Sequence, residues 1–353
     1  MFKKILALAI ACVMVTFTLA GCGGRKNADV HVFYYTYSDT YISSVRSALD
    51  KALDGAGIAY QDYDGNGNQT TQTEQIQTAI TKGARLLLVN IVNTGSDDAA
   101  NGIVALAKEK GIPVIFFNRE VSDAVIKSYD KCAFVGTRAE EAGKLQGEMI
   151  GEYLRDNFDA VDLNKDGKIS YIMFKGEEGN NEAIYRTQYS VEEADKILTA
   201  AGRAKLEFYD KSNPNKYLVD KNGQWSAAAA NEYMNTALTS YNDQNKNMIE
   251  LVICNNDGMA QGAISALNSI GYNMGEGKSI PVFGVDATAA AQELIKSKKM
   301  TGTIKQDAQG MAEALRIVAE NGLAGRSIVS GTDKYDVDKD VAKIRIAYSK
   351  YLG

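Results

Sequence analysis

Residues 250–286, ELVICNNDGMAQGAISALNSIGYNMGEGKSIPVFGVD, contain the clearest indication of the fold class of this chain. A mostly apolar run at 250–254 predicts a strand, an amphipathic stretch at 258–270 predicts a helix, and the apolar run at 280–285 predicts another strand. Strands that are apolar along nearly their whole length and are joined by a helix are typical of parallel sheets covered on both faces. The unit therefore predicts an α/β fold.

The same alternation of strand and helix patterns continues from residue 30 to the C-terminus. Further strands are predicted at 30–35, 59–63, 85–90, 113–118, 133–137, 169–175, 204–209, 302–304 and 343–347, and further helices at 41–56, 96–110, 139–157 and 308–322. A chain of 353 residues is longer than one hydrophobic core usually serves, so two lobes are expected. The predicted fold class is α/β, with two doubly wound parallel-sheet lobes.

Short polar side chains stand where several predicted strands end. These residues are Asp39, Asn118, Asn256, Asp286 and Gln306. In open parallel sheets, ligands bind outside the carboxyl ends of the strands, so we expect the five side chains to surround one crevice. Each of them could instead cap the following helix, but capping does not account well for all five together.

A second polar segment, KGEEGNNEAIYR at 175–186, contains Asn180, Glu182 and Arg186. Glu182 and Arg186 are four residues apart and share a helix face, so they could form an ion pair or reach one ligand together. The single tryptophan, Trp225, is predicted at the start of a helix, where it would ordinarily be a core or surface aromatic.

The N-terminus has the pattern of an exported lipoprotein. Two lysines precede an apolar run at 5–19, which is too short for a stop-transfer helix, and LAGC at 19–22 resembles a bacterial lipobox. The pattern predicts a signal peptide at 1–21, a diacylglycerol on Cys22 and a flexible tether at 22–27. The protein is then extracytoplasmic and anchored to the cell membrane by its lipid alone. An uncleaved ordinary signal with a chance cysteine is the alternative.

The composition excludes several functions. A net charge of -5 argues against nucleic-acid binding, which needs clustered lysines and arginines. The single histidine, His31, lies in the first predicted strand, so most histidine-dependent chemistry is unavailable. Behind the lipobox only Cys132 and Cys254 remain, and we expect them to be buried thiols rather than a disulfide; two cysteines alone cannot build a metal cluster.

Residues 162–170, DLNKDGKIS, match the first half of an EF-hand calcium loop. Asp162, Asn164 and Asp166 occupy the first, third and fifth positions, and a glycine occupies the sixth. The twelfth position should carry a bidentate glutamate but is Met173, and a strand pattern replaces the expected helix. The loop therefore lacks one carboxylate, and a solvated turn without metal is the alternative.

Six separated motifs resemble those of the periplasmic galactose/glucose-binding proteins, the class I substrate-binding components of sugar ABC transporters. The motifs are PVIFFN, DLNKDGKI, KGE.GN.EA..R, IELVICNNDGMA.GA, IPVFGVDA and GTIKQDA. The resemblance implies a type I periplasmic binding protein fold whose lobes are joined by several crossovers acting as a hinge. It places the N-terminal lobe at 28–137 plus 307–344 and the C-terminal lobe at 138–306 plus 345–353.

The resemblance also implies the ligand sites. Sugar-binding positions fall on Asp39, Tyr41, Asn118, Asn180, Glu182, Arg186, Trp225, Asn256, Asp286 and Gln306. Amides and carboxylates suit sugar hydroxyls, and two aromatic rings would sandwich a pyranose. Tyr41, Asn180, Glu182 and Gln306 replace the family's usual Phe, His, Asp and Asn, so a hexose of the D-galactose/D-glucose type is expected with its identity open.

For the loop, the resemblance implies a structural Ca²⁺. Its ligands would be Asp162, Asn164, Asp166, the backbone carbonyl of Lys168, Ser170 in place of the family's glutamine, and Glu250 as the distant carboxylate. Ser170 has a shorter side chain than glutamine and could reach the ion through water, which would lower its affinity.

The implied function is that of a monomeric binding protein, not an enzyme, that delivers a hexose to an ABC transporter permease. One alternative is a sugar sensor for a chemoreceptor or a sensor kinase. A second is a secreted glycoside hydrolase that uses two carboxylates among Asp39, Glu182 and Asp286. The amides and the arginine between these acids argue for binding rather than hydrolysis, and no catalytic residue is assigned.

Overall fold

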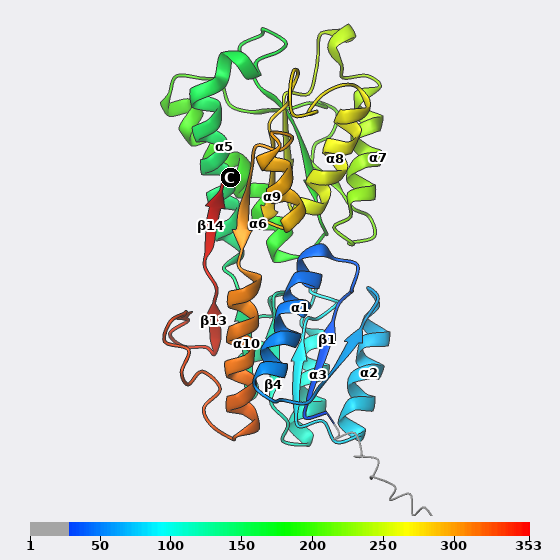
Figure 1. Cartoon of the computed structure of the whole chain (residues 1–353), viewed down its shortest axis with the longest axis vertical. Helices are drawn as coiled ribbons and strands as arrows, with labels where there is room; N and C mark the ends of the chain where they lie inside the picture. The colour runs from blue at the N-terminus through cyan, green and yellow to red at the C-terminus, as the bar shows by residue number, and fades with distance from the viewer. Residues whose placement is uncertain (1–27) are drawn as a thin grey trace, which may run out of the picture.

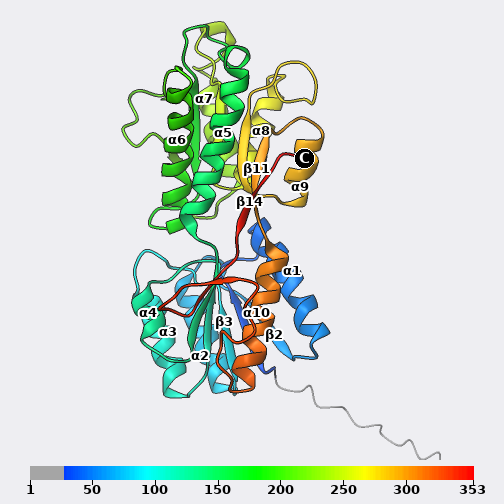
Figure 2. The same cartoon turned by 90° about the vertical axis from the view of Figure 1, so that its left-hand side faces the viewer.

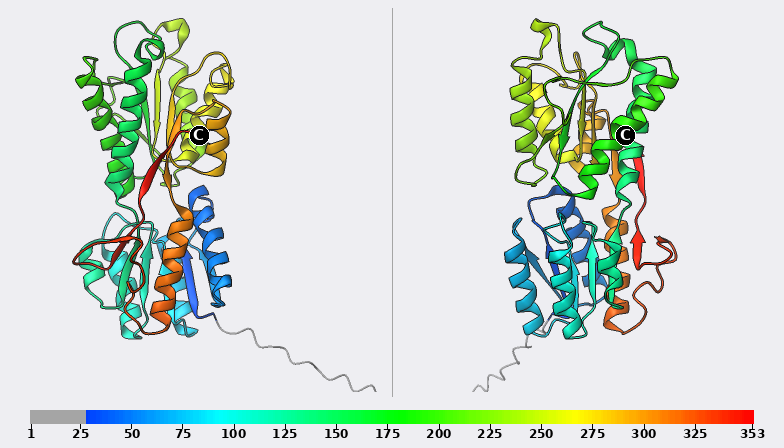
Figure 3. Two further views of the ribbon diagram at one scale, coloured as in Figure 1. Left: turned by 60° about the vertical axis from the view of Figure 1, so that its left-hand side comes forward. Right: turned by 180° about the vertical axis from the view of Figure 1, so that it is seen from behind.

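The computed structural model describes residues 28–353 and shows two lobes stacked along the long axis of the molecule (Figure 1). Each lobe contains a seven-stranded sheet with helices packed on both of its faces (Figure 3). The predicted α/β fold class with two parallel-sheet lobes is confirmed. The predicted signal peptide at 1–21 and the lipidated Cys22 lie outside the described residues.

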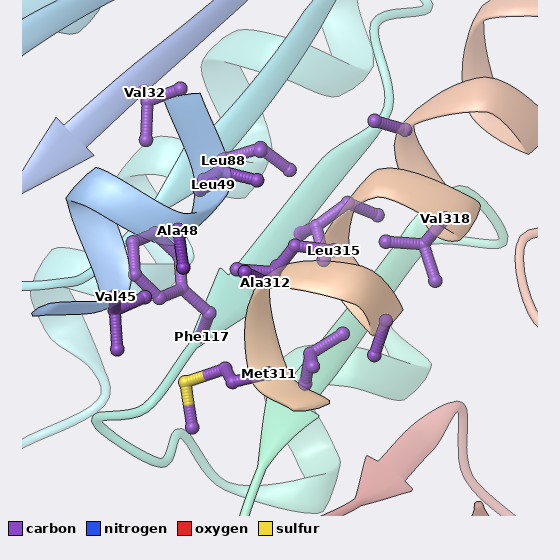
Figure 4. Close-up of a cluster of buried hydrophobic side chains, with 14 of the residues drawn as sticks. Val32, Val45, Ala48, Leu49, Leu88, Phe117, Met311, Ala312, Leu315 and Val318 are labelled. Carbon is purple, nitrogen blue, oxygen red and sulfur yellow. The ribbon is translucent and has the colours of Figure 1, made fainter. Parts of the chain in front are cut away.

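The N-terminal lobe has the strand order β12-β13-β5-β4-β3-β1-β2, parallel except for β12. Its elements are β1 (Val30–Tyr34), α1 (Thr40–Gly55), β2 (Tyr60–Asp64), α2 (Gln69–Thr81), β3 (Leu86–Val89), α3 (Asp98–Glu109), β4 (Val114–Phe117), α4 (Asp123–Lys127), β5 (Cys132–Gly136), α10 (Ala308–Leu323), β12 (Asp336–Val337) and β13 (Lys343–Arg345). On one face of the sheet, Val32 and Leu88 pack against Leu49 of α1 and Leu315 of α10 (Figure 4). The inner strands β3, β4 and β5 are apolar along their whole length because both faces of the sheet are covered there.

The C-terminal lobe has the strand order β14-β11-β10-β9-β6-β7, with β8 also paired to β6, and is parallel except for β14. Its elements are α5 (Ala139–Val161), β6 (Ser170–Lys175), α6 (Asn181–Ala200), β7 (Glu207–Phe208), β8 (Leu218–Val219), α7 (Ala227–Leu238), the 3₁₀ turn η1 (Asp243–Asn245), β9 (Leu251–Cys254), α8 (Asp257–Ser269), β10 (Val282–Asp286), α9 (Ala289–Lys296), β11 (Gly302–Gln306) and β14 (Tyr348–Tyr351). The unit predicted from residues 250–286 is confirmed as β9, α8 and β10.

The chain crosses between the lobes three times: after β5, after β11, and between β13 and β14. Figure 2 shows that α10 begins at this junction and that the red segment leading into β14 passes through it. The strand predicted at 343–347 is confirmed as the shorter β13, whereas β14, which follows it in the other sheet, was not predicted. Arg345 belongs to β13, so the N-terminal lobe extends past the boundary predicted after residue 344.

Helices α5 and α6 lie side by side against the C-terminal sheet (Figure 2). Gly143, Gly147 and Gly151 form one small-residue face of α5 at four-residue spacing. A Cβ on Gly147 would lie only 2.5 Å from the carbonyl oxygen of Tyr189, so the two backbones are in direct contact. At Gly143 a Cβ would lie 2.3 Å from the carbonyl oxygen of Tyr185, so the same close packing positions the first turns of α6, which contain the second half of the polar segment 175–186.

Cys132 and Cys254 are buried free thiols in the sheets of different lobes, as predicted. Burial raises the pKa of both thiols, to about 12 for Cys132. In residues 28–353, none of the helices combines the length and the apolar character needed to cross a membrane.

Candidate functional site

A cavity lies between the lobes at the carboxyl ends of strands from both sheets. Its lining residues are Tyr35, Asp39, Tyr41, Asn118, Arg119, Asn180, Glu182, Arg186, Trp225, Asn256, Asp286 and Gln306. All ten residues predicted as sugar ligands are therefore brought together around one space. The sequence interpretation missed Tyr35 and Arg119.

The N-terminal lobe contributes Asp39 through the start of α1. The Asp39 Oδ1 accepts a hydrogen bond from the backbone N–H of Ile42 at 2.8 Å and so caps the helix. Its Oδ2 accepts a hydrogen bond from the hydroxyl of Tyr35 at 2.6 Å. The capping interpretation and the cavity interpretation are both right here, because one carboxylate has two oxygens and the helix N-terminus opens onto the cavity.

Arg186 is the centre of the C-terminal side of the cavity, and its side chain is only 4% exposed. Its Nη1 donates to the carbonyl oxygen of Asn255 at 2.8 Å, and its Nη2 donates to Gln306 Oε1 at 3.1 Å and to the hydroxyl of Tyr348 at 2.9 Å. The Asp286 carboxylate lies 4.0 Å from Nη1. Among the described residues, Glu182 and Arg186 do not form the ion pair that their spacing suggested, because the guanidinium is directed to these other partners.

Tyr348, which the sequence interpretation did not single out, links Arg186 to the hinge. Its hydroxyl lies 2.9 Å from Thr137 Oγ1, at the first crossover, and accepts the Arg186 hydrogen bond from the other side. Burial raises the pKa of Tyr348 to about 12, so the hydroxyl stays protonated and can bridge the two groups. The guanidinium is thereby held by two of the three crossover segments, those at residues 306 and 348.

Three residues of the cavity have left-handed backbone conformations that non-glycine residues rarely adopt. The φ angles are +60° at Asn118, +54° at Trp225 and +122° at Asp286. Such conformations cost on the order of 1–3 kcal/mol each and are found where function requires a particular side-chain direction. The Trp225 ring also packs directly on Gly176, where a Cβ would lie 2.1 Å from a ring atom. The strain is consistent with a site built for a ligand.

Five of the cavity residues have a buried polar atom that has no hydrogen-bond partner within residues 28–353. These atoms are Arg119 Nε, Glu182 Oε1, Arg186 Nε, Trp225 Nε1 and Gln306 Nε2. Folded proteins pair about nine-tenths or more of their buried polar groups, and each unpaired group costs about 1–3 kcal/mol. A cavity with four donors and one acceptor left unpaired has the properties of a site for a small molecule rich in hydroxyl groups.

Two carboxylates in the cavity have strongly raised pKa values. Burial raises the pKa of Glu182 to about 7, against the opposing effect of Arg186. Burial also raises the pKa of Asp286 well above its usual range, with Arg186 opposing the shift and Asp257 and Asp39 adding to it. Burial in the cavity therefore disfavours the ionised form of both carboxyl groups.

A Glu182→Gln variant is expected to stabilise the ligand-free protein at pH 8 by a few degrees in unfolding temperature. Because the folded-state pKa of about 7 exceeds the ordinary 4.5, the folded chain holds a proton that the unfolded chain releases. Folding stability is therefore lost as pH rises through that window, by an amount on the order of 3 kcal/mol. The variant removes this loss, and below pH 4.5 it should match the wild type. Thermal unfolding at pH 4 to 8 measures this, with Glu192→Gln on the exposed side of α6 as control; identical pH profiles for both variants would contradict it.

The loop at 162–170 connects α5 to β6 and turns as the first half of an EF-hand loop does. The Asp162 carboxylate accepts backbone hydrogen bonds from Asp166 at 3.2 Å and Gly167 at 3.0 Å, and φ is +76° at the glycine. Glu250, which directly precedes β9, reaches the loop from 80 residues away: its two oxygens accept the N–H groups of Asn164 and Ser170, each at 2.8 Å.

The fit of this loop to a calcium ion is partial. In the described part of the chain, no three side chains of His, Cys, Asp or Glu gather in an arrangement that would hold a metal. The side chains of Asn164 and Ser170 both donate to the carbonyl oxygen of Met248, at 2.9 Å each. Oxygen ligands of the right kind surround the loop, but an ion would have to share or displace hydrogen bonds that already close it.

Comparison with known proteins gives one family. The family model described as a periplasmic binding protein domain matches residues 30–327. The chain is 33% identical over 343 residues to the D-galactose/methyl-galactoside binding periplasmic protein MglB of Haemophilus influenzae, covering 97% of this chain and 95% of that protein. It is 21% identical over 338 residues to the ribose import binding protein RbsB of Salmonella typhimurium, covering 96% of this chain and 98% of that protein.

Solved structures share the same fold. An ABC transporter solute binding protein from Clostridium phytofermentans with bound beta-D-glucose superimposes with a TM-score of 0.70 at 22% identity, covering 92% of this chain and 93% of that chain. One from Bacillus halodurans with bound myo-inositol gives a TM-score of 0.69 at 23% identity, covering 94% and 96%. With a family match over most of its length and a relative one-third identical along nearly all of it, this chain belongs to the periplasmic binding protein family.

Proposed function

We propose that the protein binds one neutral hexose, of the D-galactose/D-glucose type, between its lobes and delivers it to an ABC transporter. The observation that carries this proposal is the set of five buried, unpartnered polar atoms around the cavity. Family membership makes the chain a binding protein rather than an enzyme. The named relatives bind galactosides or ribose, and the similar structures contain glucose or myo-inositol, which supports a sugar or a related polyol.

The charges around the cavity support a neutral ligand. Three carboxylates, Asp39, Glu182 and Asp286, face two guanidinium groups. One guanidinium, that of Arg119, is already paired with Glu177. An anionic sugar would add a further negative charge where the existing ones are already poorly solvated. Sugar hydroxyls both donate and accept, so they complement the donors and acceptors without this cost.

The aromatic residues of the cavity come from opposite lobes. Tyr41 lies in the first turn of α1, and Trp225 directly precedes the cap of α7. Both rings line the cavity, so they are available to pack on the two apolar faces of a pyranose. Closure of the lobes would then assemble the aromatic contacts and the hydrogen bonds in one step.

The protein has to open for the ligand to enter, because most of the lining side chains are buried in the closed form. A ligand that contacts both lobes binds the closed state better than the open one and shifts the population towards closure. The three crossovers supply the hinge. We include in the proposal that the LAGC sequence anchors the protein outside the cytoplasm and that the closed form docks on a membrane permease.

A thermal-shift panel of monosaccharides tests the proposed function. A ligand that binds only the folded state raises the unfolding free energy by about 2.7 kcal/mol at 100 times its Kd. D-galactose or D-glucose should raise the unfolding temperature by several degrees, and D-glucuronate at the same concentration should not. If none of the neutral sugars, including ribose and myo-inositol, shifts unfolding, the proposal is wrong.

We further propose that the loop at 162–170 binds a structural Ca²⁺ with Glu250 as the distant ligand. The positions of Asp162, Asn164 and Asp166 in the loop, and the reach of Glu250 onto it, support this. The ion would tie β9 to the end of α5, away from the cavity.

Calcium is expected to stabilise the wild type. At 1,000 times its Kd it should raise the free energy of unfolding by about 4 kcal/mol, and the unfolding temperature should rise accordingly. In Glu250→Gln the difference between calcium and chelator should disappear, because the bidentate carboxylate is gone. Glu207→Gln is the matched control, since Glu207 pairs with Lys168 of the loop but is not a proposed ligand. Equal unfolding temperatures of the wild type in calcium and in chelator would contradict the site.

A further inference from the structure

Arg119 is fixed in the N-terminal lobe directly after Asn118. Its guanidinium lies over the ring of Tyr35 at 4.3 Å from the centroid, and its Nη2 donates to the carbonyl oxygen of Val92 at 2.8 Å. Tyr35 in turn donates to Asp39. The arginine is therefore held in place by the same residues that shape the N-terminal side of the cavity.

The same nitrogen of Arg119 also reaches the other lobe. Nη2 lies 2.7 Å from Oε2 of Glu177, which follows β6, and the two side chains are 5% and 21% exposed. Among the ion pairs of residues 28–353, this is the one that joins the lobes away from the crossovers. The backbones also meet nearby, since a Cβ on Gly179 would lie 3.5 Å from the Cα of Gly95. The pair belongs to the closed state, because separating the lobes would separate its partners.

Within residues 28–353, Arg119 has a buried polar atom that is not hydrogen-bonded. Its Nε is buried and has no partner among the described residues, and the side chain lines the cavity. The guanidinium group is planar and its N–H donors have fixed directions. A hydrogen bond at Nε therefore also sets the orientation of Nη2 for its ion pair, and the ion pair does the same for Nε. Binding at one end therefore favours the geometry required at the other.

We propose that Arg119 is a ligand-binding residue that couples occupation of the cavity to lobe closure through its ion pair with Glu177. The proposal rests on the proposed function, because it assigns Arg119 a hydroxyl of the bound sugar. We call the Arg119–Glu177 pair the latch. A sugar hydroxyl that accepts from Nε stabilises the closed state together with the latch, and the two effects are reciprocal by linkage.

The variant Glu177→Gln tests the latch, with its sequence neighbour Glu178→Gln as matched control. Glu178 pairs with Lys175 and Tyr217 inside its own lobe, so its loss removes the same charge without touching the latch. With the sugar found in the panel, Glu177→Gln should bind at least about tenfold more weakly, mainly through faster dissociation, because truncating one partner of a desolvated pair acts on the dissociation rate. Glu178→Gln should stay within about twofold of the wild type. Equal affinities of the two variants would overturn the latch.

Arg119→Lys separates the ligand contact from the charge. Lysine keeps a positive charge that can pair with Glu177, but it has no guanidinium and therefore lacks the N–H donor at Nε. This variant should also lose affinity, and more for the sugar than for an analogue that lacks the hydroxyl facing Nε. Wild-type affinity for every deoxy analogue and for the parent sugar would show that Arg119 does not bind the ligand.

A separate readout distinguishes failure of the latch from failure of the proposed function. If no monosaccharide binds the wild type, the proposed function fails, but the latch still predicts a larger closed population in ligand-free Glu178→Gln than in Glu177→Gln. Spin labels at exposed Gln77 of α2 and Glu232 of α7, on helices that lie on the side away from β14, report the distance between lobes (Figure 1). Identical distance distributions in the two variants would overturn the latch.

Discussion

An Arg186→Leu variant is expected to bind the sugar at least about 100-fold more weakly than the wild type. The guanidinium holds Gln306 and Tyr348 and compensates the buried carboxylates of Asp286 and Glu182. Leaving a buried charge without its partner costs roughly 3–5 kcal/mol, and each 1.4 kcal/mol is tenfold in affinity. The carboxylates would stay protonated to a higher pH and accept sugar hydroxyls less well. Titration calorimetry at pH 7.5 measures the loss.

Two further variants test whether the loss of affinity is specific to the guanidinium of Arg186. Arg155→Leu changes an exposed arginine on α5 whose ion pair is with its neighbour Asp156, and this variant should bind as the wild type does. Arg186→Lys keeps the charge but loses the fork, so it should fall between the wild type and Arg186→Leu. A loss smaller than tenfold for a folded Arg186→Leu protein would mean that Arg186 does not contact the ligand.

A Gly147→Leu variant is expected to destabilise the C-terminal lobe by at least about 3 kcal/mol. A Cβ at this position would lie 2.5 Å from the backbone oxygen of Tyr189, 2.8 Å from Glu193 Cβ and 2.9 Å from Ser190 O, so the side chain can fit only if α5 and α6 separate. Overpacking of this kind typically costs 1–3 kcal/mol, and more where backbone must move. At about 2–4 °C per kcal/mol, unfolding should occur around 10 °C lower.

Gly102→Leu provides the matched control for this variant. Gly102 lies in α3, and a Cβ there would meet no atom within 4 Å. Because leucine also favours helix over glycine, this control should be neutral or slightly stabilising. Calorimetry separates the outcomes, since the N-terminal lobe has its own core and should unfold near its wild-type temperature. Equal unfolding temperatures for the two variants would refute the close packing of α5 on α6.

The strands of both sheets were predictable because burial on two faces leaves a plain apolar pattern. Residues 250–286 illustrate this, as β9, α8 and β10 occur where the pattern predicts. The segments that were missed, β8, β12 and β14, are two to four residues long, and β12 and β14 pair antiparallel at sheet edges. An edge strand with one solvated face has no distinctive composition, so Tyr348–Tyr351 could not be separated from β13 by sequence alone.

The cavity was largely predictable for a topological reason. Side chains at the carboxyl ends of parallel strands meet at one edge, and the predicted residues from both lobes do so. Their role as sugar ligands remains a prediction. Arg119 was missed because its direction depends on the left-handed backbone at Asn118, and Tyr35 was missed because it continues an apolar strand. A charged residue directly after a strand-end asparagine was the only available signal.

Residues of both lobes should close on one bound sugar. Small-angle scattering of the ligand-free protein and of the protein saturated with its sugar tests this most directly. We expect a smaller radius of gyration with sugar, approaching the value calculated for the closed form in Figure 1. An unchanged radius under saturating sugar would contradict it.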